Sequence, residues 1–263
     1  MSTPIIVVDL ETTGLNMKKH EIIEIGCYNI TAGKKWSTFV HPDWTKASDT
    51  THIHGITDED VENAPPLEQA LNQLETWVGA PLEDCYVIAH NGLRFDFPWI
   101  NHVYKQIRGY SPLNFDLNCI DSINIAKHAV PAGLTTTYKL EHWANIFNLA
   151  ERQNHRAGDD CYLTVAAMEQ FCHLIVQSSP GADTELTPRE LVILSHSAPA
   201  PNLEERYARE LLLTIEEAMG LENPNTGRLN DLRREYIQKV TDLYPHLIPY
   251  YSELIPWYAR QLD

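Results

Sequence analysis

The sequence predicts an α/β protein whose mixed sheet combines three antiparallel strands with further parallel strands, is flanked by helices and is followed by an all-helical C-terminal extension. Three segments rich in β-branched and aromatic residues succeed one another near the start, and their short connections are typical of an antiparallel meander. Strand-like and helix-like segments then alternate, as in α/β sheets. We therefore expect a first domain over 1–176, a polar linker with Pro and Gly over 177–186 and a helical extension over 187–263.

The first three strands lie close together in the sequence. Four consecutive β-branched residues, from Ile5 to Val8, predict a buried first strand. Residues 21–30 form the second strand, a glycine turn follows, and residues 36–40 form the third.

The later elements alternate between strand and helix patterns. Residues 85–89 are short and wholly apolar, as in a central parallel strand, and a fifth strand is expected over 114–120. Thr57 with Asp60 marks a helix start, and Asp121 is interpreted as a helix cap. Further helices are expected over 67–78, from 96 to about 107, and over 138–149, 155–176, 187–195, 203–219, 228–243 and 252–262.

The chain has 263 residues and a formal net charge of −16. Residues 1–180 and 181–263 are both acidic, which argues against a protein that coats long nucleic acid by neutralising phosphates. The acidic charge is still compatible with an enzyme that binds only a few nucleotides, through metal ions and base stacking. The start does not resemble a signal peptide, no stretch is apolar enough for a membrane span, and the five scattered cysteines indicate free thiols. We therefore expect a cytoplasmic protein that does not associate with membranes.

Asp9 and Glu11 follow the first apolar run. Side chains two residues apart on a strand point to the same face, about 7 Å apart. Two such carboxylates repel each other unless a cation lies between them, and Mg²⁺ or Mn²⁺ prefers carboxylate oxygens. On these two residues alone, a metal site and a solvated polar turn are equally compatible with the sequence.

Three further polar residues, Asp96, His155 and Asp160, stand where a predicted strand ends or a helix begins. This is where α/β sheets place their sites. Together with Asp9 and Glu11 they form a set suited to two divalent ions, about 4 Å apart, that support phosphodiester hydrolysis. A neutral histidine nearby is able to accept a proton from water because its unperturbed pKa lies near neutrality.

Three motifs occur in order along the first domain. They are D-L-E-T-T-G at 9–14, Asn91 followed by F-D at 95–96, and H-R-A-G-D-D at 155–160. With these motifs the sequence resembles the DEDD superfamily of 3′→5′ exonucleases, the DnaQ-like group, in its His-bearing subclass. The sister subclass carries Tyr four residues before the last Asp, where this chain has Arg156. The resemblance implies a ribonuclease-H-like fold.

The resemblance covers residues 4–176 and includes an H-G-I-T loop at 54–57, which is a family feature. The stretch H-N-G-L-R-F-D-F-P at 90–98 is similar to the three-prime repair exonucleases, which degrade DNA ends. The third motif departs from theirs, with Gly-Asp at 158–159 in place of the usual Glu-Gly. The resemblance therefore implies the 3′ ends of nucleic acid as substrate, with DNA favoured over RNA.

The resemblance also implies a role for each chemical residue. Asp9, Glu11 and Asp160 would bind the tighter of two Mg²⁺ (or Mn²⁺) ions. Asp9 and Asp96, directly or through water, would bind the second ion. His155 would be the general base.

The same resemblance implies contacts with the 3′-terminal nucleotide. Leu15 would wedge against the base, which tolerates any base and suits an enzyme that trims any sequence. The residues implied are Thr12, Thr13 and Leu15, with His54, Asn91 and Phe95 as further candidates.

Several residues keep a second interpretation. Asp159 is an alternative ligand to Asp160, but adjacent helical positions point about 100° apart and the spacing from His155 favours Asp160. His54 is equally compatible with packing of its loop. Lys18-Lys19 is interpreted as a solvated turn rather than a phosphate contact.

Two alternatives to a DNA exonuclease remain: an RNA 3′-end trimmer of the same family, and an exonuclease-fold adaptor recruited through its C-terminal helices. The apolar block 243–251 either packs the extension onto the first domain or forms a partner or dimer surface. Residues 187–263 are accordingly the candidate region for a protein partner.

Overall fold

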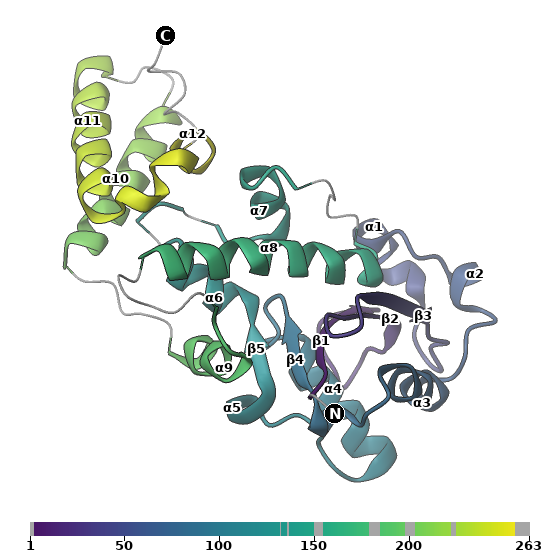
Figure 1. The fold of residues 1–263 in the computed structure, drawn as a ribbon. Coiled ribbons are helices and arrows are strands. Elements are labelled where there is room, and N and C mark those ends of the chain that lie inside the picture. The colour runs from purple at the N-terminus through teal and green to yellow at the C-terminus, as the bar shows by residue number, and fades with distance from the viewer. Residues whose placement is uncertain are drawn as a thin grey trace.

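The computed structural model describes residues 3–131, 133–135, 137–149, 155–178, 185–197, 203–221 and 225–255. A five-stranded sheet forms the centre, with helices on both faces (Figure 1). In their order across the sheet, the strands are β3 (Lys34–Phe39), β2 (Ile22–Asn29), β1 (Ile5–Thr12), β4 (Tyr86–Ala89) and β5 (Cys119–Asp121). The predicted α/β fold with a mixed sheet is confirmed.

The strand directions agree with the prediction, but the last strand does not begin where we expected it. β1 pairs antiparallel with β2, and β2 with β3, whereas β4 is parallel to both β1 and β5. Residues 115–118 form a helical turn, α5 (Phe115–Asn118), because the Asn114 side chain accepts a hydrogen bond from the Asp116 amide and caps that turn. The strand predicted over 114–120 is therefore wrong in its first part, and only 119–121 pair in the sheet.

The helices of the first domain follow the predicted periodicity. The Thr57 hydroxyl and the Asp60 carboxylate form the expected capping box, and the Asp121 carboxylate caps the helix after β5. The longer helices are α3 (Leu67–Val78), α4 (Asp96–Arg108), α6 (Ser122–Ala129), α7 (Leu140–Ile146) and α8 (Ala157–Ser178). Short turns are η1 (Ala47–Asp49), α1 (Thr51–His54), α2 (Asp58–Val61) and η2 (Leu82–Asp84).

The sheet separates two hydrophobic layers. The successive side chains of β1 alternate between them, since Val7 packs on the α6–α8 side and Ile6 on the α3–α4 side. The same alternation continues to the end of β1. Asp9 and Glu11 are two residues apart, so both point to one face of the strand.

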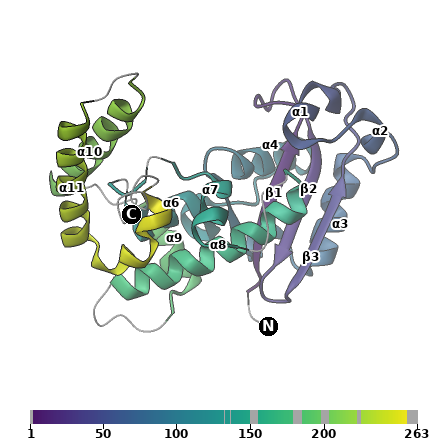
Figure 2. The same ribbon diagram turned by 90° about the horizontal axis from the view of Figure 1, so that it is seen from above.

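The C-terminal region is helical, as predicted. Figures 1 and 2 place the α10–α11 pair at the end of the molecule away from β1, β2 and β3. The elements are α9 (Pro188–His196), α10 (Leu203–Met219), α11 (Thr226–Leu243), η3 (Pro245–Tyr250) and α12 (Tyr251–Leu254). Most of the predicted linker, 179–184, and of the predicted last helix, 256–262, lies outside the described residues.

Helix α9 covers the edge of the sheet. β5 is the edge strand, and the Asp121 amide on it donates a 2.6 Å hydrogen bond to the buried Ser195 hydroxyl of α9. The Asn124 side chain donates to the Ser195 carbonyl at 2.7 Å. Covering an edge in this way protects it from pairing with another chain. The first helix of the extension thus packs against the edge strand of the first domain.

The apolar block 243–251 packs inward. Tyr244, Leu247 and Tyr251 are buried in the hydrophobic layer that also contains α7 and α8, and the Tyr250 ring contacts the Phe147 ring. This favours the packing interpretation of the block. None of the described helices combines the length and the apolar character needed to span a bilayer.

Candidate active site

Strand β1 and helix α4 bring three carboxylates to one end of the sheet. Asp9 and Glu11 share a face of β1, and Glu11 lies directly opposite Glu24 of β2. Asp96 occupies the first position of α4, where it is buried, and its Oδ1 accepts a 3.1 Å hydrogen bond from the Leu10 amide. That bond ties the start of α4 to β1 between the two other acids.

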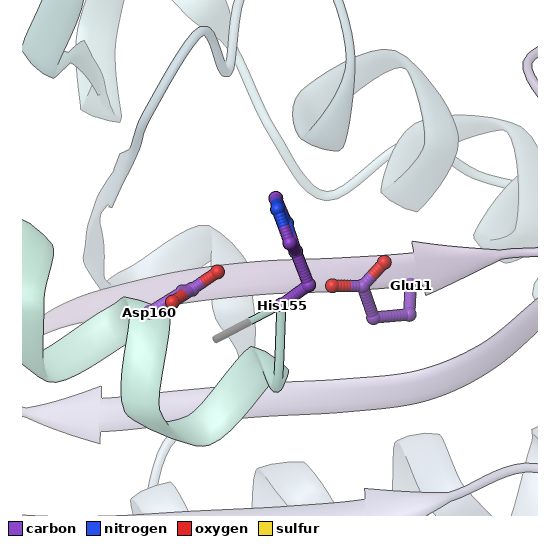
Figure 3. Close-up of side chains that lie close together, drawn as sticks. All are labelled: Glu11, His155 and Asp160. Carbon is purple, nitrogen blue, oxygen red and sulfur yellow. The ribbon is translucent and has the colours of Figure 1, made fainter. Parts of the chain in front are cut away.

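Helix α8 supplies the remaining side chains. His155 precedes the helix with a left-handed backbone (φ 53°), and Asp160 is buried in the first turn. Donor atoms of Glu11, His155 and Asp160 all lie within 4.8 Å of one another, and Figure 3 shows these side chains converging. Asp159 pairs instead with Lys35 of β3. The geometry therefore favours Asp160 over Asp159 as the member of this cluster.

Burial and crowding shift the titration of these acids. The pKa of Asp9 is raised well above its ordinary value, chiefly by burial and then by Asp96, Glu11 and Asp160. Burial, Asp160 and Glu24 raise the pKa of Glu11 to about 8, and burial raises that of Asp96 to about 8. Like charges packed this closely oppose one another's ionisation.

The donor set fits a hard divalent cation. It is rich in carboxylate oxygen, as Mg²⁺ and Mn²⁺ require, and a bound cation would offset the repulsion that raises the three pKa values. Asp9, Glu11, Asp96 and Asp160 are the residues able to hold such ions.

The turn after β1 has two different parts. The Thr12 hydroxyl donates to the Gly14 carbonyl, and the buried Thr13 hydroxyl accepts from the Glu21 amide and donates to Thr45. These hydroxyls are thus occupied in shaping the turn. Leu15, at its tip, is 85% exposed. Of Thr12, Thr13 and Leu15, only Leu15 is exposed to solvent.

His54 is buried and packs its own loop. Its Nδ1 accepts from the Ile56 amide at 3.0 Å, and its Nε2 lies 2.7 Å from the Thr50 hydroxyl. Thr50 in turn donates to the Thr12 carbonyl at 2.9 Å. This arrangement favours the packing interpretation of His54, and it links His54 indirectly to the turn after β1.

Asn91 lines the same cleft as His155. This cleft has a volume of about 470 Å³, and its other walls include Tyr138 and Lys139. Asn91 has a left-handed backbone (φ 64°), which asparagine tolerates better than most residues. Phe95 is partly buried and its ring packs against Trp99 rather than standing free.

Three contributions to this site escaped the sequence analysis. The carboxylate of Asp121 also accepts from the Leu93 amide, so it holds the Asn91 turn as well as capping α6. Glu24 contacts the start of α8, and the signal for it was a lone acid inside the apolar run 22–25. Lys139 precedes a helix far from the motifs, and nothing in the sequence singles it out.

A mixed sheet that gathers buried carboxylates and a histidine at one end is typical of metal-dependent nucleases. Residues 6–168 match the family model RNase T, described as exonuclease, and the chain belongs to this exonuclease family. The match places the chain in the DnaQ/RNase T group within the DEDD superfamily, whose members depend on divalent metal. The predicted family is confirmed, and helices α9 to α12 lie beyond the matched residues.

Two curated relatives are named as DNA polymerase III proteins. The chain is 30% identical over 173 residues to a DNA polymerase III PolC-type of Thermotoga maritima, covering 65% of this chain and 12% of that protein. It is 34% identical over 145 residues to the DNA polymerase III subunit epsilon of Buchnera aphidicola, covering 50% of this chain and 59% of that subunit. The chain thus spans only part of the length of either relative.

Solved structures share the fold. Exonuclease X in complex with 5′-overhanging duplex DNA has a TM-score of 0.50 at 22% identity, covering 73% of this chain and 99% of that one. Escherichia coli Exonuclease I in complex with a dA16 oligonucleotide has a TM-score of 0.53 at 16% identity, covering 66% and 42%.

Proposed function

We propose that the chain is a 3′→5′ exonuclease that hydrolyses the terminal phosphodiester of DNA, with preference for single-stranded ends, and releases nucleoside 5′-monophosphates. The convergence of Glu11, His155 and Asp160 within 4.8 Å, next to Asp9 and Asp96, carries this proposal. The proposed catalytic domain is 1–176, with the linker over 177–186 and the extension over 187–263.

The proposed metal ligands follow from the acids in the cluster. Asp9, Glu11 and Asp160 would hold the tighter of two Mg²⁺ (or Mn²⁺) ions, and Asp9 with Asp96 the second. When bound, these cations supply Lewis-acid stabilisation of the charge that develops on the phosphoryl and leaving 3′ oxygens. The shared ligand Asp9 keeps both sites at one end of β1.

His155 is the proposed general base. It stands at the exposed side of the cluster, where it lines the cleft and still reaches the ligand acids. A water on that side gives its proton to the imidazole while the water oxygen attacks phosphorus, and the bond from phosphorus to the 3′ oxygen of the preceding nucleotide breaks. The left-handed backbone at His155 turns the chain just before α8, so that the imidazole and Asp160 face the same point.

The 3′-terminal nucleotide is proposed to lie between two groups of residues. Leu15, at the exposed tip of its turn, would wedge against the base, with Thr12 and Thr13 shaping that turn. On the side of His155, Asn91 lines the cleft and Lys139 would supply a cation for a phosphate. Phe95 and His54 would support these loops through packing rather than contact the nucleotide.

The preference for DNA rests on likeness. The motif at 90–98 is similar to the three-prime repair exonucleases. Two relatives are named as DNA polymerase III proteins, and two solved neighbours are titled as complexes with DNA. These names support DNA as the substrate class of this chain.

The deciding experiment is digestion of 5′-labelled single-stranded DNA, duplex DNA and RNA of one sequence, with Mg²⁺ or Mn²⁺ and with chelator. We expect shortening from the 3′ end, fastest on single-stranded DNA, with nucleoside 5′-monophosphates as products and no digestion by Asp9→Ala. Preferential shortening of RNA would identify a trimmer instead. Failure to cut any substrate, with DNA still bound, would identify an adaptor.

A further inference from the structure

The start of α8 is docked directly onto the neighbouring strands β2 and β3. Gly26 of β2 faces the backbone of α8, and a Cβ atom added at Gly26 would collide with the Ala157 carbonyl. Gly158 faces Ser37 of β3, where a Cβ would lie 3.2 Å from the Ser37 Cβ. Only glycine permits the first contact, because any side chain would push the helix away from the sheet. The backbone between His155 and Asp160 therefore packs directly against the backbone of the sheet at Gly26, with no side chain between them.

Glu24 of β2 lies in the middle of this contact. It is buried, with 2% of its surface exposed, although it carries a carboxylate inside an apolar run. Its Oε2 accepts hydrogen bonds from the Arg156 Nε and from the Ala157 amide, each at 3.3 Å, and its Oε1 accepts from Arg156 Nη2 at 3.2 Å. The Arg156 guanidinium also lies over the Phe39 ring, 5.0 Å from its centroid.

These bonds satisfy a backbone group that a helix start otherwise leaves open. The first amides of an α-helix have no partner within the helix, and a carboxylate that accepts from one of them also complements the helix dipole. Glu24 supplies that acceptor from a neighbouring strand rather than from the preceding residue. The backbone just after His155 is therefore fixed relative to β2, and so is the turn that carries Asp160.

Glu24 is also directly opposite Glu11 in the β1–β2 pairing. Two acids that face each other across strands repel, so Glu24 destabilises the sheet locally unless other groups compensate its charge. Both its oxygens are engaged with Arg156 and Ala157, and among the described residues the donors that converge within 4.8 Å are Glu11, His155 and Asp160. This arrangement favours an anchoring role over a role as a further metal ligand.

We infer that Glu24 is a positioning residue, which acts through Arg156 and the Ala157 amide to hold His155 and Asp160 against Glu11. The inference rests on the proposed function, because it assigns Glu24 to the same reaction. It adds that the β2 strand, and not β1 alone, determines the geometry of the cluster.

The test compares Glu24→Ala, Glu24→Gln and Arg156→Ala with Glu75→Gln. Glu75 is the control, because this half-buried acid likewise accepts from an arginine, Arg108, at 2.7 Å, but on α3 beyond the opposite face of the sheet. Three quantities are measured: kcat and KM on 5′-labelled single-stranded DNA, Mn²⁺ affinity, and thermal stability.

We expect Glu24→Ala to lower kcat by about 10- to 100-fold, as loss of a group that orients active-site residues typically does, with little change in KM. Glu24→Gln, which still accepts from the Ala157 amide, should retain more of kcat. Because Glu24 and Arg156 act as one unit, the kcat of the double variant Glu24→Ala/Arg156→Ala should be no lower than that of the slower single variant. Glu75→Gln should leave kcat unchanged.

Other outcomes would overturn the inference. Additive losses in the double variant would show that the two residues act separately. A loss of Mn²⁺ affinity in Glu24→Gln as large as that in Asp9→Asn would make Glu24 a ligand. If kcat falls as much in Glu75→Gln as in Glu24→Gln, the loss of activity reflects a general loss of stability and not the position of Glu24.

Hydrogen exchange of peptides covering 156–165 separates this inference from the proposed function. Glu24→Ala should accelerate exchange at the start of α8, and Glu75→Gln should not. A wild-type chain that digests no nucleic acid would refute the proposed function, while faster exchange in Glu24→Ala would still support the anchor. Unchanged exchange would refute the anchor even in an active enzyme.

Discussion

Asp159 and Asp160 are consecutive in the chain, yet their carboxylates have opposite environments. Asp159 pairs with Lys35 at the surface of β3, whereas Asp160 is buried beside Glu11 and His155. Adjacent positions of a helix differ by about 100°, so only one of two neighbours faces a given point. The docking of α8 on β2 determines which one that is.

This difference predicts the behaviour of two matched variants. Asp160→Asn should reduce kcat by at least about 10²-fold, because it removes a proposed ligand, while Asp159→Asn should stay within about threefold of wild type since an exposed ion pair contributes little. Kinetics on 5′-labelled single-stranded DNA measure both. Equal losses in the two variants would mean that the helix is rotated relative to the cluster when substrate binds.

Metal ions should stabilise the folded chain. The acids of the cluster repel one another, as their raised pKa values indicate, and a ligand present at 100 times its Kd adds about 2.7 kcal/mol. We expect Mg²⁺ or Mn²⁺ to raise the midpoint temperature of thermal denaturation by several degrees, and a chelator to reverse this shift. In Asp9→Asn the shift should vanish, although the metal-free variant should be no less stable than metal-free wild type, since one repelling charge is gone. A metal-induced shift of wild-type size in that variant would exclude Asp9 as the shared ligand.

Lys139 should contribute to substrate binding. It lines the cleft beside His155 and Asn91 and is exposed, so it is available to a phosphate. We expect Lys139→Ala to raise KM about 3- to 10-fold with kcat nearly unchanged and to reduce the salt dependence of KM. Lys18→Ala is the control, because Lys18 lies in the turn that we interpret as solvated. A larger effect at Lys18 would move the phosphate track to the turn after β1.

The contact between α9 and the sheet should be measurable as stability. Ser195→Ala leaves the buried Asp121 amide without its acceptor, which should lower the free energy of unfolding by about 1–3 kcal/mol. Ser197→Ala, at the exposed end of α9, should change it by less than about 0.5 kcal/mol. Denaturant titration compares the two variants. Equal stabilities would indicate that α9 does not protect the edge strand in solution.

His90 should make stability depend on pH. Burial lowers its pKa from 6.5 to about 4, and its Nδ1 lies 2.7 Å from the Ser122 hydroxyl. The unfolded chain binds a proton at this residue below pH 6.5, but the folded chain does so only below about 4, so the contribution of His90 to stability falls as pH decreases through this interval. The stability of wild type relative to His90→Gln should therefore fall by roughly 2–3 kcal/mol between pH 7 and 4. A constant difference across that range would show that His90 is hydrated in the folded state.

Much of the fold was predictable because its signals are local. The β-branched run before Asp9, the short connections to the next two strands and the helix caps at Thr57 and Asp121 depend on neighbours in the sequence, and the structure contains each of them. The fifth strand was misplaced because the Asn114 side chain begins a helical turn, a local competition that apolar periodicity does not reveal.

The sequence by itself determined the class of fold, the exonuclease family and the set of acids and histidine proposed for the chemistry, because strand periodicity and motif spacing are properties of the chain alone. Only the tertiary structure decided that Asp160 rather than Asp159 joins the cluster and that α9 covers the edge of the sheet. The physical reason is the same in each case. These outcomes depend on contacts such as Glu24 with Ala157, formed between residues 133 positions apart, which no local pattern encodes.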